Sequence, residues 1–223
     1  MDRVADIRAQ FVQLKKERAF IVDKTGCDML EIIGATFIAD EDAIFGTVNH
    51  DYVQREIQWY ETQSLNVYDI PGGPPPREWI RSATPDGRIN SNYGWAIWNN
   101  ENHSQYDHVK QELLLNPTSR RATMIYTRPN MWIDHCAGGM SDFMCTNAVQ
   151  AFIRDGKLDV LVQMRSNDAV FGYKNDRAWQ CHIQKLLADD LNLPLGRMIW
   201  HVGSLHVYSR HHYLIDGESV SDT

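Results

Sequence analysis

The sequence predicts an α/β or α+β fold in which helices cover a β-sheet. Three segments carry the strand signal: residues 29–39 and 196–215 are long and rich in β-branched and aromatic residues, and residues 144–166 have the pattern of a hairpin. Segments with apolar residues at helical spacing separate them. The 223 residues are enough to bury a core without disulfides or metals, so we expect one domain over residues 1–223.

The first half of the chain predicts a helix, a strand and a second helix. Residues 5–18 have apolar positions at helical spacing, and residues 29–39 form a buried strand. Residues 51–65 begin with an aspartate and continue with apolar positions at 53, 57, 60 and 65, which indicates a helix that carries Glu56. The stretch IPGGPPPREW is a loop, and the aromatic residues after it indicate that the same domain continues.

The second half predicts two more helices and the remaining strands. In order, these are a helix at 105–115, a strand at 120–129, hairpin strands at 144–154 and 157–166, a helix at 175–191, and one strand, or two broken at Gly203, at 196–215. The segment after Ile215 is short and polar. If it acts as a lid over a ligand, we expect that lid to exclude water weakly.

Composition narrows the class of function. The net charge is −7, whereas a general nucleic-acid surface needs a basic excess. No apolar run approaches the roughly 18 residues of a membrane helix, and the charged N-terminus is unlike a signal peptide, so we expect a cytosolic protein. Four widely spaced cysteines fit free thiols, and His211-His212 has no companion ligands, so we expect no metal. An anionic ligand would depend on local cations such as Arg120, Arg121 and Arg165.

The open end of the predicted hairpin carries a thiol and a guanidinium. Cys145 and Arg165 are each ten residues from Asp155 in the turn, so antiparallel pairing places them opposite each other. A guanidinium beside a thiol favours the thiolate, which is the nucleophilic form. The alternative is that Cys145 is a small buried hydrophobe and Arg165 a surface cation, which is the commoner case for a single cysteine.

Six motifs resemble the thymidylate synthase superfamily, in the family's order and over nearly the whole chain: DKTG, REIQWY, NYGWAIW, NPTSRR, MRSNDAVFGYKND and GSLHVYSRH. Within it, INSNYGWAIW, MSDFMCTN and VGSLHVYSRH look like the bacteriophage deoxycytidylate (dCMP) hydroxymethylases. The resemblance implies a thymidylate synthase-like fold, with a large mixed β-sheet and flanking helices, and a homodimer packed through the sheets. It also implies 5,10-methylenetetrahydrofolate as the co-substrate.

The resemblance assigns several positions to the nucleotide. Cys145 corresponds to the nucleophile that adds to C6 of the pyrimidine. His206 and Tyr208, two apart on a strand and so on one face, correspond to the pair that hydrogen-bonds the sugar 3′-hydroxyl. A single histidine is otherwise more often a satisfied core residue. The 5′-phosphate falls to Arg165, Ser166 and Lys24, together with Arg120 and Arg121 of the neighbouring subunit, which are shared across the dimer interface.

Four further positions correspond to groups that handle protons or folate. Glu56 corresponds to a glutamate that manages protons and an ordered water near the base, and Tyr93 to a tyrosine in the same water network. Asp168 corresponds to an aspartate that contacts folate, and Trp79 to a tryptophan that packs on the folate ring. Without the resemblance, Glu56 would be interpreted as a solvated helix carboxylate.

Asp176, eleven residues after Arg165, departs from the uracil-using synthases, which have Asn there. An amide can donate to O4 and accept from N3–H of uracil, whereas cytosine presents an amino donor at C4 and a bare N3 acceptor. A carboxylate accepts from the amino group and can stabilise or supply a proton at N3, which lowers the barrier to addition at C6. The alternative is that Asp176 is the N-cap of a helix at 177–190.

These residues predict one-carbon transfer to C5 of dCMP through a covalent adduct between Cys145 and C6. Addition of water would give 5-hydroxymethyl-dCMP and tetrahydrofolate, whereas hydride transfer would give a 5-methyl product and dihydrofolate. The residues of these motifs favour hydroxymethylation, because they resemble the hydroxymethylases. Thr146 and Met144, which replace the His and Pro of the synthases, agree with this expectation. A dCMP methylase, a CMP hydroxymethylase and a nucleotide- or RNA-binding module without catalysis remain alternatives. We expect the protein in the cytoplasm, that of an infected bacterial host.

Overall fold

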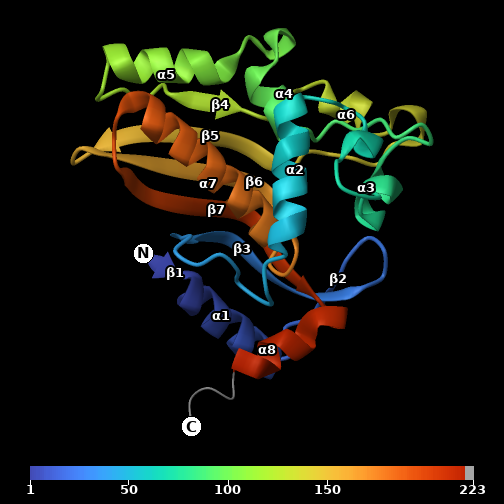
Figure 1. Cartoon of the computed structure of the whole chain (residues 1–223). Helices are drawn as coiled ribbons and strands as arrows, with labels where there is room; N and C mark the ends of the chain where they lie inside the picture. Colours follow the sequence, from blue (N-terminus) through green and yellow to red (C-terminus); the bar gives the residue numbers. More distant parts are fainter. Residues whose placement is uncertain (219–223) are drawn as a thin grey trace.

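A seven-stranded mixed β-sheet forms the centre of the computed structural model, which describes residues 1–218 (Figure 1). The strand order is β1-β3-β7-β6-β5-β4, with β2 paired to the start of β3. Neighbours β6 and β7 are parallel, as are β1 and β3, and the remaining pairs are antiparallel. The strands are β1 (Asp2–Arg3), β2 (Ile21–Val22), β3 (Asp28–Ile38), β4 (Thr123–Ile125), β5 (Thr146–Arg154), β6 (Lys157–Asp168) and β7 (Leu195–Tyr208).

Helices flank this sheet, which confirms the predicted fold class. Figure 1 shows α7 running across β5, β6 and β7 with α2 beside it, α5 next to β4, and α1 against α8 near β3. The α-helices are α1 (Val4–Lys16), α2 (His50–Thr62), α3 (Arg77–Ser82), α4 (Tyr93–Trp98), α5 (Gln105–Leu115), α6 (Met131–Asp134), α7 (Gly172–Leu191) and α8 (His212–Glu218). Short 3₁₀ turns are η1 (Val67–Asp69), η2 (Asn100–Asn102), η3 (Ala137–Gly139) and η4 (Ser209–His211).

Three predicted elements differ in extent from the observed ones. The strand expected at 120–129 is only β4, because the chain pairs with β5 over three residues. The strand expected at 196–215 is unbroken at Gly203 and ends at Tyr208, after which the chain turns into α8. Of the polar segment after Ile215, residues 219–223 lie outside the described residues. The helix expected at 175–191 begins at Gly172.

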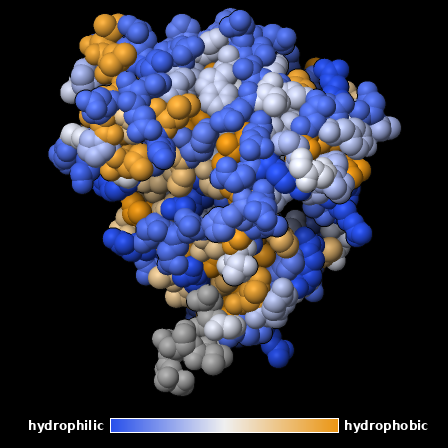
Figure 2. All heavy atoms as spheres, viewed as in Figure 1, coloured by the Kyte–Doolittle hydropathy of each residue, from blue (hydrophilic) through white to orange (hydrophobic). Residues whose placement is uncertain are grey.

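Buried aromatic residues fix α7 and α2 relative to the sheet. Tyr173 of α7 packs against Phe37 of β3, with ring centroids 5.9 Å apart, and against Trp200 of β7 at 5.4 Å. Trp179, farther along α7, packs edge to face on Tyr60 of α2 at 5.0 Å. The face of the molecule that Figure 2 shows, viewed as in Figure 1, is mainly hydrophilic, with scattered apolar patches. The core therefore holds two helices at a defined distance from each other and from the sheet.

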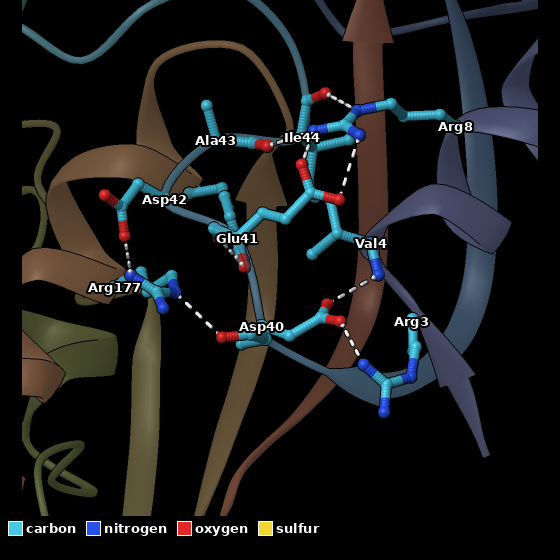
Figure 3. A network of polar contacts seen from close by, with 11 residues as sticks. Arg3, Val4, Arg8, Asp40, Glu41, Asp42, Ala43, Ile44 and Arg177 are labelled. Atoms are coloured by element: carbon cyan, nitrogen blue, oxygen red, sulfur yellow. Dashed lines mark hydrogen bonds and ion pairs between the residues drawn. The ribbon is translucent and has the colours of Figure 1, made fainter.

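An acidic segment between β3 and α2 ties α1 to α7 (Figure 3). Arg3 pairs with Asp40 at 2.8 Å, and Arg8 makes a bidentate pair with Glu41 at 2.6 and 3.1 Å. Arg177 of α7 donates to the Ala39 carbonyl at 2.9 Å, and it also pairs with the carboxylate of Asp42. These contacts anchor the first half of α7 on the side of the helix that faces the β3–α2 connection.

We expect Gly94→Ala to destabilise the protein strongly. A Cβ at this position in α4 would lie 1.8 Å from the Tyr60 carbonyl oxygen of α2, so the two helices must separate. The cost should be about 3 kcal/mol or more in the free energy of unfolding, measured by urea denaturation. Gly217→Ala is the matched control, because its Cβ meets nothing within 4 Å, and it should change stability by less than about 1 kcal/mol. Equal effects of the two substitutions would contradict this packing.

Candidate active site

The β5–β6 hairpin brings Cys145 and Arg165 opposite each other, as predicted, but a bulge is needed to do so. A two-residue turn at Asp155-Gly156, with φ angles of 51° and 70°, centres the hairpin. Unbroken pairing from this turn would put Cys145 opposite Ser166. A bulge between Thr146 and Ala148 inserts one residue, and the Arg165 N–H donates to the Cys145 carbonyl at 2.9 Å.

The Arg165 guanidinium is fixed beside the Cys145 sulfur. Its Nε donates to the Met144 carbonyl at 3.0 Å and its Nη2 to the Phe143 carbonyl at 2.5 Å. Nη2 lies 3.7 Å from Sγ of Cys145. The guanidinium also lies over the Phe143 ring, 5.0 Å from its centroid. The backbone on either side of the thiol therefore sets the position of the cation.

The charge state of Cys145 differs from the sequence expectation. Burial raises the pKa of the thiol to about 11, and the charges of Asp176 and Asp142 act in the same direction. Arg165 lowers this pKa, but less than burial raises it. The expectation of a thiolate was therefore wrong for the ligand-free protein, in which Cys145 is a thiol at neutral pH. The expected direction of the Arg165 effect is confirmed.

Asp176 projects from α7 into a set of hydrogen-bond donors. Tyr93 donates its hydroxyl to Oδ1 at 3.1 Å, and Asn167 donates its amide to Oδ2 at 2.7 Å. Burial, and secondly the charge of Glu56, raise the pKa of Asp176 to about 7. The alternative role as an N-cap is wrong, because the N-cap of α7 is Phe171. Asp176 is thus a partly buried carboxyl group that changes protonation near neutral pH.

Glu56 is buried on the face of α2 that points toward Asp176. Its side chain is 5% exposed, so the reading of a solvated helix carboxylate is wrong. Oε1 accepts from the Tyr52 hydroxyl at 2.6 Å and from the Trp79 indole N–H at 3.0 Å. Burial raises the pKa of Glu56, and these two hydrogen bonds oppose the rise. Trp79, predicted to pack on folate, lies on α3 with its ring against Trp59, 5.3 Å between centroids.

The ends of β6 and β7 place the predicted sugar and folate contacts side by side. Asp168 of β6 lies opposite His206 of β7 in the parallel ladder, and Ser166 lies opposite Ser204. The rings of His206 and Tyr208 meet edge to face at 5.1 Å. The Asp168 carboxylate accepts from the backbone N–H groups that follow it, at 2.7 and 3.2 Å, and so shapes the turn into α7.

The remaining predicted residues lie apart from this cluster. Lys24 is in the exposed turn between β2 and β3, near the strand end that pairs with Tyr208. Arg120 and Arg121 are exposed just before β4, and Gln150 donates to the Arg120 carbonyl at 2.8 Å. Gln150 is five residues along β5 from Cys145, which is about 16 Å of extended chain. The backbone of both arginines therefore lies far from Cys145 of their own chain, and the Arg121 side chain pairs with Glu112.

Three residues that complete the cluster were not predicted. Asn167 donates to Asp176 and accepts from the Trp200 indole at 3.3 Å. It was not predicted as a site residue, although the motif Arg-Ser-Asn-Asp contains it. Tyr52 precedes Glu56 by four residues on one helix, a spacing that predicts side-chain contact. Asp142 has no such signal, because its partners lie some fifty residues away in the chain.

Two kinds of feature are lacking in the part of the chain that the structure describes. Residues 1–218 contain no group of three or more His, Cys, Asp or Glu side chains that could hold a metal ion. No helix within the same range is long and apolar enough to cross a membrane.

The sequence and the fold are those of a known family. A sequence model of the family described as thymidylate synthase matches residues 44–218. The chain also aligns along most of its length with the thermostable thymidylate synthase A of Bacillus subtilis, with a TM-score of 0.72 at 23% identity, covering 96% of this chain and 84% of that one. The chain belongs to the thymidylate synthase family.

Curated relatives narrow the similarity within the family. The chain is 54% identical over 220 residues to the deoxycytidylate 5-hydroxymethyltransferases of Enterobacteria phages T4 and T2, covering 96% of this chain and 89% of each relative. A thymidylate synthase of Bacillus licheniformis is 26% identical over 163 residues, which is 70% of this chain and 57% of that protein.

We expect Asp176→Asn to change how stability depends on pH. A carboxyl whose pKa is raised on folding, here from 3.8 to about 7, is neutral in the native state and charged in the unfolded state between these values, so native stability falls as pH rises through them. The variant lacks this loss, which is at most about 4 kcal/mol. Urea denaturation at pH 4 and pH 8 should show the variant gaining stability relative to wild type at the higher pH. Parallel curves for wild type, Asp176→Asn and the exposed control Asp189→Asn would contradict the raised pKa.

Proposed function

We propose that this enzyme transfers a one-carbon unit from 5,10-methylenetetrahydrofolate to C5 of dCMP and adds water, giving 5-hydroxymethyl-dCMP and tetrahydrofolate. The single observation that carries the proposal is Asp176, a carboxyl held by Tyr93 and Asn167, with a pKa of about 7, whose charge acts on the Cys145 thiol. A carboxylate accepts a hydrogen bond from the 4-amino group of cytosine, whereas O4 of uracil would face it with a lone pair. The identity to the phage deoxycytidylate 5-hydroxymethyltransferases supports the same substrate.

Cys145 is the nucleophile of the proposed reaction. Its sulfur forms a bond to C6 of the base, and the electron pair of the C5–C6 double bond moves through the ring toward N3. Asp176 supplies the proton that N3 takes up, which a carboxyl with a pKa of about 7 can do at neutral pH. The proton lost by the thiol restores Asp176, so the addition is balanced. Arg165 stabilises negative charge on sulfur while the thiol proton leaves.

C5 of the resulting adduct takes up the one-carbon unit. The new C5–C bond forms, C5 loses its proton, and tetrahydrofolate leaves with that proton on its nitrogen, which gives an exocyclic methylene on the base. Water then adds to this methylene. Elimination of Cys145 from C6 restores the aromatic ring, and the N3 proton returns through Asp176 to the thiolate. Glu56, a buried carboxyl held through Oε1, is the group that takes the proton from the water. Tyr93, which donates to Asp176, binds in the same water network. Asp168 and Trp79 contact the folate.

Substrate binding uses the sheet end and a second subunit. Arg165, Ser166 and Lys24 bind the 5′-phosphate, and His206 and Tyr208 bind the 3′-hydroxyl. The protein acts as a homodimer packed through its sheets, one catalytic domain per chain, and Arg120 and Arg121 reach the phosphate of the neighbouring site. Their exposure before β4 supports this assignment, as do the exposed apolar side chains Ile33 of β3 and Ile125 of β4. The enzyme works in the cytoplasm of an infected bacterial cell.

The proposed reaction is tested by mass spectrometry of the products formed from dCMP, CMP and dUMP, each with methylenetetrahydrofolate. We expect a gain of about 30 Da on dCMP, the mass of CH₂O, with no dihydrofolate formed. A gain of about 14 Da with dihydrofolate would identify a methylase, and preference for CMP would identify a ribonucleotide enzyme. Cys145→Ala should lower turnover more than about a thousandfold while dCMP binding is retained. Unchanged turnover in this variant would exclude the covalent mechanism.

We expect Asp176→Asn to move base preference from cytosine to uracil. The amide donates to O4 and accepts from N3–H, but it presents an unpaired donor to the 4-amino group, so kcat/KM for dCMP should fall about a hundredfold or more. kcat/KM for dUMP should be higher in Asp176→Asn than in wild type. The control Asp189→Asn, exposed near the other end of α7, should leave both values unchanged. A uniform loss on both nucleotides would remove Asp176 from base recognition.

A further inference from the structure

A buried carboxylate near the nucleophile has no part in the proposed reaction. Asp142 lies three residues before Cys145 and is 8% exposed. Its Oδ2 accepts from the backbone N–H of Asn90 at 2.8 Å, and its Oδ1 accepts from the hydroxyl of Ser91 at 2.7 Å. Both donors belong to the segment that leads into α4. A buried carboxylate with two well-made hydrogen bonds is costly to desolvate, so its retention calls for a role.

The same two segments are joined by a return contact. The Asn90 side-chain amide lies 3.3 Å from the Asp142 carbonyl oxygen, to which it donates, and 3.1 Å from the Met140 sulfur. Asn92 then caps α4 by accepting from the Trp95 N–H at 2.7 Å, and Tyr93 follows as the first residue of the helix. The Asp142 contacts therefore fix the chain that carries Cys145 against the chain that carries Tyr93.

Arg165 holds the other end of the segment that carries the nucleophile. It donates to the carbonyl oxygens of Phe143 and Met144, the two residues between Asp142 and Cys145. The four residues from Asp142 to Cys145 are thus held by a carboxylate at one end and a guanidinium at the other. Without the Asp142 contacts, the side chain of Arg165 and the β5 ladder would still hold the thiol end of this segment, but its link to the Tyr93 segment would be lost.

The charge of Asp142 also acts on Cys145. Four groups face the thiol: Arg165 from β6, Asp176 from α7, Tyr93 from α4, and Asp142 from its own segment. Arg165 lowers the pKa of the thiol, whereas the carboxylates at 176 and 142 raise it. Burial raises the pKa of Asp142 itself, and its hydrogen bonds to Ser91 and Asn90 and the charge of Arg165 oppose that rise.

We propose that Asp142 is a positioning residue: it fixes the Cys145 segment against the Tyr93 segment, and its negative charge, held three residues from Cys145, opposes the effect of the Arg165 charge on the thiol. The positional part rests on the proposed function, because it concerns the approach of sulfur to C6. The electrostatic part does not, since it describes the ligand-free protein. The two parts can therefore be tested separately.

The electrostatic part is tested by alkylation of the ligand-free protein with iodoacetamide across pH 7 to 12, with modification of Cys145 followed by mass spectrometry of its peptide. The peptide mass distinguishes modification of Cys145 from modification of Cys27, Cys136 and Cys181. Asp142→Asn keeps the shape and removes the charge, so the midpoint of the pH profile should fall by about half to one unit, which raises the thiolate fraction about three- to tenfold at pH 8. Ser91→Ala keeps the charge and removes one hydrogen bond, so its midpoint should match wild type.

Two outcomes would overturn the electrostatic part. One is a midpoint in Asp142→Asn equal to that of wild type. The other is an equal shift in Ser91→Ala, which would mean that the midpoint moves without removal of the Asp142 charge. A looser site alone raises the alkylation rate at every pH and leaves the midpoint in place, so accessibility is not mistaken for charge.

The positional part is tested by steady-state kinetics with dCMP. Ser91→Ala should lower kcat about three- to tenfold and Asp142→Ala about ten- to a hundredfold, with KM for dCMP within about twofold of wild type, because orientation of the nucleophile is lost and nucleotide contacts are kept. Asp142→Asn should recover most of the lost kcat. If kcat falls only in proportion to the folded fraction, measured by circular dichroism, the positional part is overturned. If Asp142→Ala does not fold, Ser91→Ala still tests the positional part. Inactivity of wild type would count against the proposed function, whereas the alkylation result would stand.

Discussion

The register of β6 between its two neighbours is the constraint on which the site depends. This strand is antiparallel to β5 and parallel to β7, so two hydrogen-bond ladders place its end: the β5 ladder reaches Met164 and the Arg165 N–H, and the β7 ladder continues to Asp168. One ladder sets Arg165 beside Cys145, and the other sets Asp168 beside His206. Groups from three separate parts of the chain therefore meet at one sheet end, and helix α7 begins four residues after the strand. No single loop decides their arrangement.

Burial of ionisable groups is the second organising feature. Glu56 and Asp176 lie on two helices whose aromatic residues pack together, and the charge of Glu56 raises the pKa of Asp176. Donors from Tyr52, Trp79 and Asn167 offset part of the cost of burying these groups. The result is a site with fewer charges at neutral pH than the sequence suggests. A carboxyl such as Asp176, whose pKa lies near the pH at which the enzyme works, gives and takes a proton more readily than a fully ionised one.

The sequence predicted the fold class and the proximity of several candidate residues, and the failures have physical causes. The hairpin and the helix of Glu56 follow from local periodicity. The pairing of Cys145 with Arg165 was predicted by counting from Asp155, but the observed two-residue turn gives this pairing only with the bulge, which counting does not predict. The charge state of Cys145 does not follow from the local sequence, because desolvation depends on tertiary packing that one segment cannot reveal. The contacts of Asp142 with Asn90 and Ser91 join distant segments and leave no periodic trace. Arg120 and Arg121 concern a second chain, whose position one sequence does not specify.

The bulge near Asn147 has a consequence for how this chain can vary over evolutionary time. The bulge takes up one residue of β5 that has no partner on β6, so Cys145 lies opposite Arg165 and not opposite Ser166. Loss of that one residue would remove the bulge and leave the pairing of Cys145 with Arg165 in place. An insertion or deletion elsewhere in β5 would turn the side chains between the change and the bulge to the opposite face of the sheet, since side chains alternate with a period of two. Lineages of this protein should therefore accept many substitutions along β5 and β6, and they should tolerate a change of length best at the bulge itself.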